Sequence, residues 1–395
     1  MKSAYLWTYL LDIPLWSILA MLPFIALREL QATQWQLTLM LTLYSAVSIF
    51  SPYWSDFVNK RRDRLVSNVV LGGVLGHLPF LFFPFTTNIY WYIASYALYM
   101  FFYRSVTPAW MELLKIYAEP GIRERIVAYV LSLSYLITPL FACLIGWMLD
   151  EYPLYWREIY AVTAAISLLS TTVQLQMQRE PKNGESTEAI CLYRPWKNMW
   201  ELLKKRSDYR TFQIGFMLGG AGLMILQTAR AEIFMNVLEL NYLELTFAIS
   251  LCKGVGFAFA SGLWASFLSR VNIFRFSSLV VFLFSLYPLG LLAAKAHILI
   301  LFAVCLLYGV SQAGSEIVWK LSGPLFSRSE DSSLYTSVNV FTVGLRGCIT
   351  NPIGGLLLFA FGPAAVMGVA FLLCLFASAH LFLASRKTGE LIAAA

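Results

Sequence analysis

Charged residues are scarce in this chain of 395 residues. They make up 13% of it, whereas an ordinary soluble domain carries about 25%. Hydrophobic residues reach 59%, and the mean hydropathy is +0.66. Because so many apolar side chains exceed what one protein interior can hold, most of them must face lipid. The composition therefore excludes a soluble enzyme, a nucleic-acid-binding protein and a disordered scaffold.

Metal-binding and catalytic motifs are missing as well. The six cysteines stand singly, without a CxxC pair, at positions 143, 191, 252, 305, 348 and 374. This spacing supports neither a disulfide framework nor a zinc site. The histidines His77, His297 and His380 are dispersed, and the sequence has no HExxH, no GxSxG and no Walker phosphate loop. We therefore predict that the protein is not an enzyme and has no metal and no cofactor.

What the chain does contain is a series of long apolar runs separated by polar or charged clusters. Only helices fit these runs, because lipid offers no partner for unpaired backbone groups and the alternation of barrel strands is absent. The first run, Tyr5–Leu27, is not followed by a small-residue cleavage site, so we interpret it as a retained helix. The sequence predicts an all-α polytopic membrane protein with twelve transmembrane helices, at approximately residues 5–27, 35–57, 65–84, 89–115, 126–149, 157–177, 209–235, 241–268, 274–294, 297–321, 333–361 and 363–385.

Basic residues lie mainly on one side of these predicted helices. Of the 29 Lys and Arg residues, 20 fall in alternate loops and at the termini, three in the opposite loops, and six within or at the ends of spans. The positive-inside rule then places both termini in the cytoplasm, and an even number of spans, which puts both termini on the same side, agrees with that. The net charge of +7 thus reflects topology, and we predict no nucleic-acid partner.

A polar stretch separates two halves of the chain. Residues 178–210 carry eight Lys or Arg residues together with Pro181 and Gly184. We predict an N-terminal six-helix bundle, a cytoplasmic linker and a C-terminal six-helix bundle, with boundaries at 1–177, 178–208 and 209–395.

The two halves also resemble each other in sequence. Residues 30–38 align with 238–246, and 52–60 with 262–270, at a shift of about 210 residues, as in a duplicated fold. Two such bundles related by a pseudo-twofold axis leave a cleft, which is where an alternating-access transporter binds its solute. The repeat therefore predicts a transporter.

The loop after the second predicted helix resembles a family motif. It contains Asp56 followed by the basic residues Lys60, Arg61 and Arg62, and it is similar to the G-x-x-x-D-R-x-G-R-R loop of the major facilitator superfamily. The segments Pro108-Ala-Trp110 and Asn351-Pro352-Ile-Gly354-Gly355 resemble a bacterial branch of the same family. The resemblance implies a secondary transporter of the bacterial inner membrane, in which Asp56, Arg61 and Arg62 latch the cytoplasmic side. Because Pro52, Phe57 and Asn59 depart from the motif, we expect a looser or differently bonded latch.

The fifth predicted helix lacks most of an antiporter signature. Where that signature of the superfamily has Gly-Pro followed closely by Gly-Gly, this chain has Thr138-Pro139 and then a single glycine, Gly146. A proline kink supported by neighbouring helices explains what remains. Efflux antiport of drugs or metabolites is therefore kept only as an alternative, together with a non-transporting receptor-like protein and an intramembrane enzyme.

Two ionisable residues of the first half fall at the same predicted depth. Asp12 in the first helix and Arg104 in the fourth both lie roughly 20 Å below the outer surface at 1.5 Å per residue. A charge within the membrane costs about 2.5–3.5 kcal/mol unless it has a partner or water. We predict that Asp12 and Arg104 pair, either as a staple between helices or as a gating or proton-linked pair.

The second half carries more buried positive than negative charge. Lys253 and Arg346 fall near the middle of the membrane without an acidic residue at their depth, whereas Glu316 is spaced to pair with Lys320. We predict that Lys253, Arg346 and Arg104 contact a solute bearing a carboxylate or phosphate, and that Glu316 takes part in coupling or gating. The alternative for Arg346, which lies between Gly344 and Gly347, is a hydrogen bond to backbone carbonyls at a kink.

The energy source follows from the missing nucleotide site. Without a phosphate loop, transport of a small molecule must be driven by an ion gradient or by the solute gradient itself. We predict a secondary transporter in the lipid bilayer, with the proton as the candidate coupling ion and a monomeric state.

Overall fold

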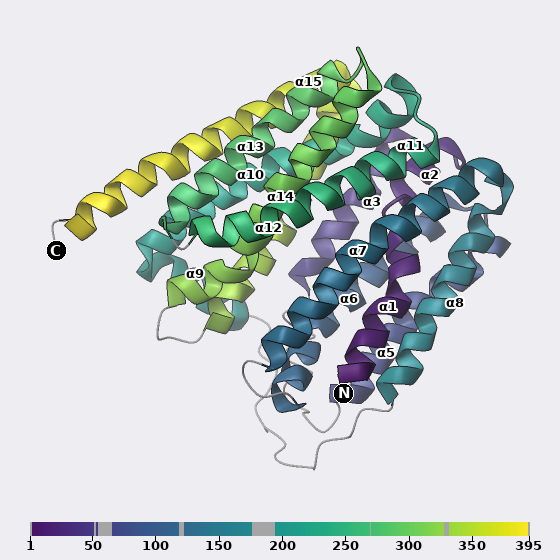
Figure 1. Ribbon diagram of the computed structural model, residues 1–395, viewed down its shortest axis with the longest axis horizontal. Helices are drawn as coiled ribbons and strands as arrows, with labels where there is room; N and C mark the ends of the chain where they lie inside the picture. Colours follow the sequence, from purple (N-terminus) through teal and green to yellow (C-terminus); the bar gives the residue numbers. More distant parts are fainter. Residues whose placement is uncertain are drawn as a thin grey trace. The chain divides into compact units, whose positions relative to one another are not determined.

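The computed structural model describes residues 2–50, 53, 65–117, 122–175, 194–268, 270–327 and 332–393, and their regular structure is helical throughout (Figure 1). Within these ranges, eight helical segments are long and apolar enough to cross a membrane. The all-α polytopic class is thus confirmed, and the count of twelve spans stays a prediction. The principal helices are α1 (Lys2–Leu19), α2 (Leu22–Arg28), α3 (Gln34–Ala46), α5 (Leu65–His77), α6 (Ile89–Tyr117), α7 (Ile122–Glu151), α8 (Trp156–Leu175), α9 (Arg194–Lys205), α10 (Ser207–Glu232), α11 (Tyr242–Thr246), α12 (Lys253–Leu268), α13 (Ile273–Ala293), α14 (Ile298–Ser327) and α15 (Ser332–Ala393).

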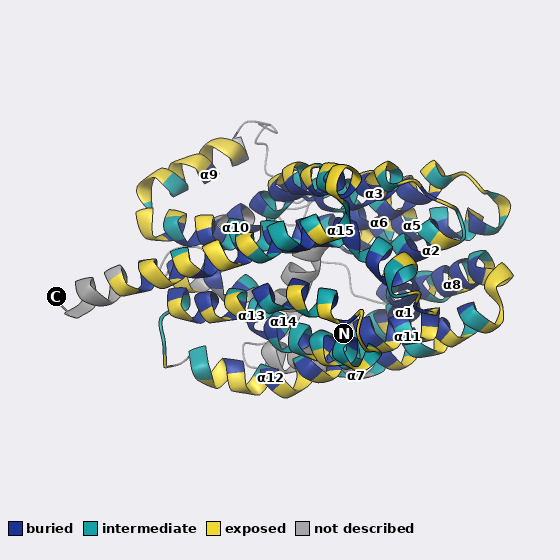
Figure 2. Cartoon of the chain, turned by 90° about the horizontal axis from the view of Figure 1, so that it is seen from above, coloured by how far each residue is buried: buried dark blue, intermediate teal, exposed yellow. Residues whose placement is uncertain are grey.

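Shorter helical turns join several of these elements. The 3-10 turns are η1 (Val47–Ile49), η3 (Leu78–Phe85) and η4 (Pro153–Tyr155), and the π-helical turns are η5 (Ile233–Val237) and η6 (Phe247–Cys252). Buried residues lie along the faces where helices pack, and exposed residues lie along their other faces (Figure 2). Many exposed side chains are large and apolar, such as Leu140, Leu263 and Phe359, each more than 60% exposed. Such apolar outer faces suit contact with lipid.

The helices form two compact units. Unit 1 comprises Met1–Leu192 and the short segment Asn241–Thr246, and unit 2 comprises Tyr193–Leu240 and Phe247–Ala395. The predicted bundle boundaries at 177 and 209 stay a prediction, and the sequence did not indicate that residues 241–246 group with the first half.

Unit 1 is built on α1, which packs against α7 and α8, and on α5, which packs against α6 and α8. Its core holds fully buried aromatic side chains, among them Phe80, Phe83 and Tyr160. The Tyr160 hydroxyl donates a hydrogen bond to the backbone carbonyl of Ile18 over 2.8 Å. This bond joins α8 to the end of α1 and satisfies a buried polar group.

Segment 241–246 is fastened to unit 1 by a carboxylate. Asp150, near the end of α7, accepts hydrogen bonds from the backbone amides of Tyr242 at 2.9 Å and Leu243 at 2.7 Å. The Tyr242 hydroxyl donates to the Glu29 carboxylate at 3.0 Å. Gly146 of α7 lets α11 approach closely, because a Cβ atom at this position would lie 2.8 Å from the Tyr242 carbonyl oxygen. The first turn of α11 is thereby capped by Asp150.

Unit 2 is built on α10 and α13, which run along α15, and on α12, which runs along α14. A buried polar network crosses its aromatic core. The Tyr209 hydroxyl lies 2.8 Å from the Tyr335 carbonyl and 2.9 Å from the Asn339 side-chain oxygen, and the Asn339 amide donates to Ser322 at 2.8 Å. Gln213 donates to Tyr209 at 2.6 Å. The network thus ties together α10, α14 and α15.

Two features of unit 2 bear on the sequence predictions. The long helix α15 contains a break at Gly362, whose φ of 75° is strained for any residue except glycine, and Pro363 follows. This break falls where the sequence analysis separated its last two apolar runs. Helix α9 lies inside the predicted linker and buries Met199 and Leu202 in the core of unit 2, an ordered helix that the polar composition of the linker did not indicate.

Candidate functional site

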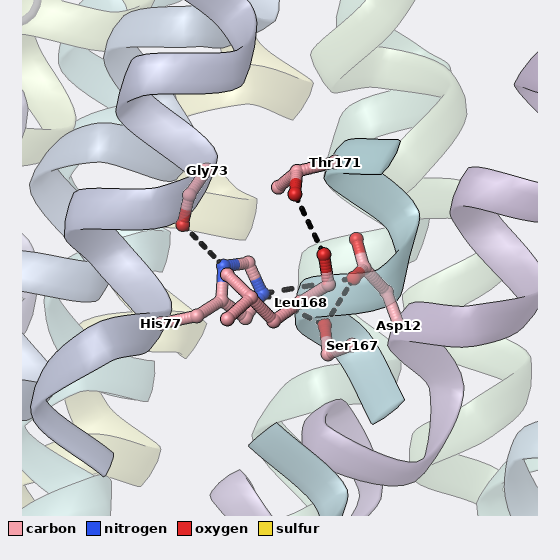
Figure 3. Close-up of polar contacts among 6 residues, drawn as sticks. All are labelled: Asp12, Gly73, His77, Ser167, Leu168 and Thr171. Carbon is pink, nitrogen blue, oxygen red and sulfur yellow. Dashed lines mark hydrogen bonds and ion pairs between the residues drawn. The ribbon is translucent and has the colours of Figure 1, made fainter. Parts of the chain in front are cut away.

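A polar cluster joins three helices of unit 1 (Figure 3). Asp12 comes from α1, His77 is the last residue of α5, and Ser167 lies in the middle of α8. The side chain of His77 is 8% exposed and that of Asp12 is 20% exposed, while Ser167 is fully buried. Polar groups at such positions are costly unless they are hydrogen-bonded, and here they bond to one another.

The cluster depends on close packing of α5 against α8. Gly73, one turn before His77, faces Thr171 of α8, and a Cβ atom on it would lie 2.9 Å from the Thr171 methyl carbon. Thr171 turns its hydroxyl to its own helix and donates to the Leu168 carbonyl at 2.7 Å. The small residue therefore brings the imidazole of His77 within reach of α8.

Each polar atom of the cluster has a defined partner. Nδ1 of His77 lies 2.5 Å from the Gly73 carbonyl oxygen, and Nε2 lies 2.7 Å from the Ser167 hydroxyl. Ser167 also hydrogen-bonds to Oδ1 of Asp12, and Nε2 of His77 lies 3.6 Å from the same oxygen. The ring of Tyr99 packs edge-on to the imidazole, with 5.2 Å between ring centroids. The carboxylate, hydroxyl and imidazole thus form a continuous chain.

The structure does not bring Asp12 and Arg104 together as an ion pair. The guanidinium of Arg104 lies over the ring of Tyr44, 5.2 Å from its centroid, whereas the partners of Asp12 are Ser167 and His77. Both charges interact electrostatically with Tyr103. Equal depth fixes only one coordinate of a side chain, and the direction in which it leaves its helix decides its partner. The roles of Asp12 and Arg104 in coupling, gating or solute binding stay predictions.

In unit 2, Lys253 is the first residue of α12 and follows the π-helical turn η6. Such turns occur frequently at functional sites. Its ammonium lies within electrostatic range of Arg230, Glu316 and the Cys305 thiol. Among the residues that the structure describes, Lys253 forms no hydrogen bond or ion pair. This partly buried cation therefore faces one acidic and one basic side chain without bonding to either.

Aromatic side chains border this group. The rings of Tyr287 and Tyr308 lie 4.5 Å apart between centroids, and both interact electrostatically with Arg230 and Cys305. Arg230, near the end of an apolar run, is not among the site residues predicted from the sequence. In the structure, Arg230 lies within electrostatic range of Lys253.

Arg346 of α15 is buried against α10. Its Nη1 donates to the Phe216 carbonyl at 3.1 Å, its Nε contacts the Met224 sulfur at 3.4 Å, and its guanidinium lies 5.6 Å from the centroid of the Phe216 ring. Gly220 faces the guanidinium and leaves room for it. The backbone contact expected as an alternative is thus present, but its carbonyl belongs to α10 rather than to a kink in α15.

Some residues predicted to belong to the site do not contact one another, and others lie outside the described residues. No interaction within the described part of the chain links Arg346 to Lys253 or to any charged side chain. Glu316 lies on α14 near Lys253, and the side chain of its predicted partner Lys320 is outside the described residues. Asp56, Arg61 and Arg62 also lie outside the described residues, so the cytoplasmic latch stays a prediction.

The sequence analysis missed His77 and Ser167. The spacing of Gly73 and His77 by one helical turn in an apolar segment could have marked His77, because a glycine there allows a second helix to approach. Ser167 gave no such signal, since serine is common in membrane helices and often bonds its own backbone.

Together, the apolar helices, the two units and the buried polar groups define a polytopic membrane protein of the transporter class. A model of the Major Facilitator Superfamily matches residues 6–320, and the chain belongs to this superfamily. It is a multi-pass membrane transporter of the secondary class and not an enzyme. No curated protein matches the chain significantly.

Solved structures agree in fold. A POT family transporter in complex with 5-aminolevulinic acid has a TM-score of 0.78 at 12% identity, with 98% of this chain and 96% of that chain covered. A mutant of the nucleoside transporter NupG has a TM-score of 0.72 at 14% identity, with 97% and 98% covered. A bacterial homologue of the human lysosomal transporter Spinster has a TM-score of 0.64 at 14% identity, with 98% and 96% covered. At such identities the likeness shows the fold alone.

Proposed function

We propose that this protein moves a small solute bearing a carboxylate or phosphate across the membrane by alternating access. The observation that supports it is Lys253, a partly buried cation with no ion pair among the described residues and with both Arg230 and Glu316 in electrostatic range. A buried charge that lacks a partner favours contact with water or with a bound counter-ion. Because the two basic side chains, Lys253 and Arg230, outnumber the one carboxylate of Glu316, this part of unit 2 favours binding of an anion.

Arg346 is the second proposed contact. It is 8% exposed and uses Nη1 and Nε to bond α10, which leaves its Nη2 group without a bond among the described residues. A guanidinium held on one edge and open on another can bind a carboxylate or phosphate oxygen. In this proposal Arg346 is positioned by Phe216 and Met224 and offers its remaining edge to the solute.

The remaining roles complete the proposal. Arg104 is a third solute contact, Asp12 and Glu316 take part in coupling or gating, and Asp56 with Arg61 and Arg62 latches the cytoplasmic side. Coupling is to protons or to the solute gradient. The protein is monomeric, resides in a bacterial inner membrane and has cytoplasmic termini. Efflux antiport and a receptor-like role are the competing proposals.

A binding screen tests the charge of the solute. Purified protein is heated with inorganic phosphate, succinate, 5-aminolevulinic acid, uridine or a quaternary ammonium ion, since a compound that binds the folded state raises its unfolding temperature. We expect an anion to stabilise the wild type. We expect Lys253→Gln and Arg346→Gln each to weaken its binding about tenfold or more, which corresponds to about 1.4 kcal/mol.

Lys295→Gln is the matched control, because Lys295 is exposed and loses the same charge. It should bind the anion like the wild type. Stabilisation by the neutral or cationic compounds alone would contradict the proposal. So would anion binding that survives both substitutions in folded protein.

A further inference from the structure

We propose that Asp12, Ser167 and His77 form a binding site for one proton, which makes the proton the coupling ion of this transporter. The inference rests on the proposed function, since a coupling ion has meaning only in a transporter. It starts from the hydrogen bonds of the cluster rather than from the depth of its residues.

Counting hydrogens shows that the bonded cluster holds an extra proton. The Gly73 carbonyl can only accept, so Nδ1 of His77 carries a hydrogen. The two contacts of Ser167, to Nε2 of His77 and to Oδ1 of Asp12, need two hydrogens between them. The hydroxyl supplies one. The other must therefore reside on Nε2 or on the Asp12 carboxyl.

Two arrangements satisfy this count. In the first, an imidazolium donates through Nε2 to Ser167, and Ser167 donates to an ionised Asp12. In the second, a protonated Asp12 donates to Ser167, and Ser167 donates to a neutral His77. An isolated imidazole loses its second proton near pH 6.5, and an isolated aspartic acid ionises near pH 3.9. At neutral pH an independent pair would therefore hold no such proton, so the extra hydrogen of this proposal depends on the hydrogen bonds to Ser167.

Loss of the proton has a structural consequence. With neutral His77 and ionised Asp12, the single hydroxyl hydrogen of Ser167 can serve only one neighbour. Either the contact of α8 with α1 or its contact with α5 then loses its hydrogen bond. Proton release is thus linked to the packing of three helices in unit 1, which is what coupling an ion to a conformational change requires.

The tyrosines and the arginine near the cluster do not compete with Asp12, Ser167 and His77 for the proton. Tyr99 and Tyr103 of α6 interact electrostatically with Asp12, and Tyr103 also interacts with Tyr9, Tyr44 and Arg104. Phenols stay protonated near neutral pH, and the Arg104 guanidinium lies over Tyr44. Asp12, with a side chain 20% exposed, is the group through which a proton can enter.

The described residues of the other packed elements contribute no competing charge within reach. On α8 the charged residues Arg157 and Glu158 lie about 14 Å or more from Ser167 by helical rise. On α7 the described charged side chains, Asp150 and Glu151, lie at the end of the helix. Among the described residues of α5, His77 is the one ionisable side chain, and η3 consists of apolar residues and prolines.

Spectroscopy of the full-length protein tests the proton count without a solute. Nitrogen-15 spectra of the imidazoles report protonation and tautomer, with single His297→Gln and His380→Gln variants to assign the signals. Infrared spectra report a protonated carboxyl. We expect the wild type at neutral pH to show either a His77 imidazolium or a protonated Asp12 that disappears in Asp12→Asn. A neutral His77 together with an ionised Asp12 would overturn the inference, even if no variant of the cluster could be purified.

Asp12→Asn sharpens the test because asparagine imitates the protonated acid. Its amide donates to Ser167, so Ser167 can donate to a neutral His77 and all contacts survive. We expect His77 in this variant to be neutral, with its hydrogen on Nδ1. A His77 imidazolium that persists unchanged in Asp12→Asn would contradict a shared proton. Glu151→Gln, which removes an exposed carboxylate, should reproduce the wild-type spectra.

Transport assays separate this inference from the proposed function. In proteoliposomes, exchange of labelled phosphate or succinate measures transport, and accumulation driven by a pH gradient measures coupling. We expect the ratio of accumulation to exchange to fall at least tenfold in Asp12→Asn and to stay at the wild-type value in Glu151→Gln. Absence of any exchange in the wild type would reject the proposed function. Normal exchange with an unchanged ratio in Asp12→Asn would reject the proton site alone.

Discussion

The backbone carbonyl of Gly73 accepts a hydrogen bond from Nδ1 of His77, one helical turn further along α5, at 2.5 Å. This bond fixes which imidazole nitrogen carries a hydrogen and directs the other nitrogen to Ser167. The same glycine leaves the space in which α8 approaches α5. One residue thus orients the imidazole and brings its partner within reach.

Gly73→Ala should therefore disturb the cluster. The added methyl would lie 2.9 Å from the Thr171 methyl carbon, and overpacking of this kind costs about 1–3 kcal/mol. We expect a lower unfolding temperature in detergent and a weaker contact of His77 with Ser167, visible in the nitrogen-15 spectrum. Gly76→Ala is the control, because its methyl would meet Phe102 at an ordinary 3.5 Å. If the two variants are equally stable, the close approach at Gly73 is not important.

Gly220→Ala should weaken anion binding without removing a charge. A methyl at this position would collide with the Arg346 guanidinium, which must then leave the Phe216 carbonyl or turn its free edge away. We expect the affinity for the anion found in the binding screen to fall about fivefold or more, or about 1 kcal/mol. Gly262→Ala, where no atom lies within 4 Å, should bind like the wild type. Unchanged binding in Gly220→Ala would contradict the role of Arg346.

Asp150→Ala should release α11 from α7. The carboxylate accepts hydrogen bonds from two backbone amides, at 2.9 and 2.7 Å, and a hydrogen bond to a charged group contributes about 1.5–3 kcal/mol. We expect thermal unfolding at a lower temperature and faster labelling of a cysteine placed at Leu243. Glu151→Ala removes the adjacent exposed carboxylate and should leave both measurements unchanged. Equal labelling of the two variants would show that Asp150 does not hold the segment.

The helical class and the break near Gly362 could be predicted because both depend on local sequence. Apolar runs of spanning length exclude other structures in lipid, and a glycine followed by proline favours a break in a helix, as at Gly362 and Pro363. Helix α9 was missed because a polar linker gives no apolar run. Its buried residues, Met199 and Leu202, are spaced by three positions, a short amphipathic pattern among many basic side chains.

The partners of the buried charges could be predicted only in part. Sequence position gave the depth of Asp12, but the rotation of α1 and the approach of α5 through Gly73 decide that it meets Ser167 and His77. Arg346 was correctly recognised as a buried cation, yet its carbonyl partner comes from Phe216, 130 residues away. Contacts of this kind depend on helix packing, which one sequence does not specify.

Exchange in proteoliposomes tests the central claim, transport of an anion, most directly. Vesicles containing the purified protein are loaded with unlabelled phosphate, succinate or 5-aminolevulinic acid, and the entry of the same labelled compound is followed. The account predicts protein-dependent exchange of at least one of these compounds, reduced about tenfold or more by Lys253→Gln and unaffected by Lys295→Gln. Exchange of uridine or of a quaternary ammonium ion alone, or no exchange of any compound by folded protein, would contradict it.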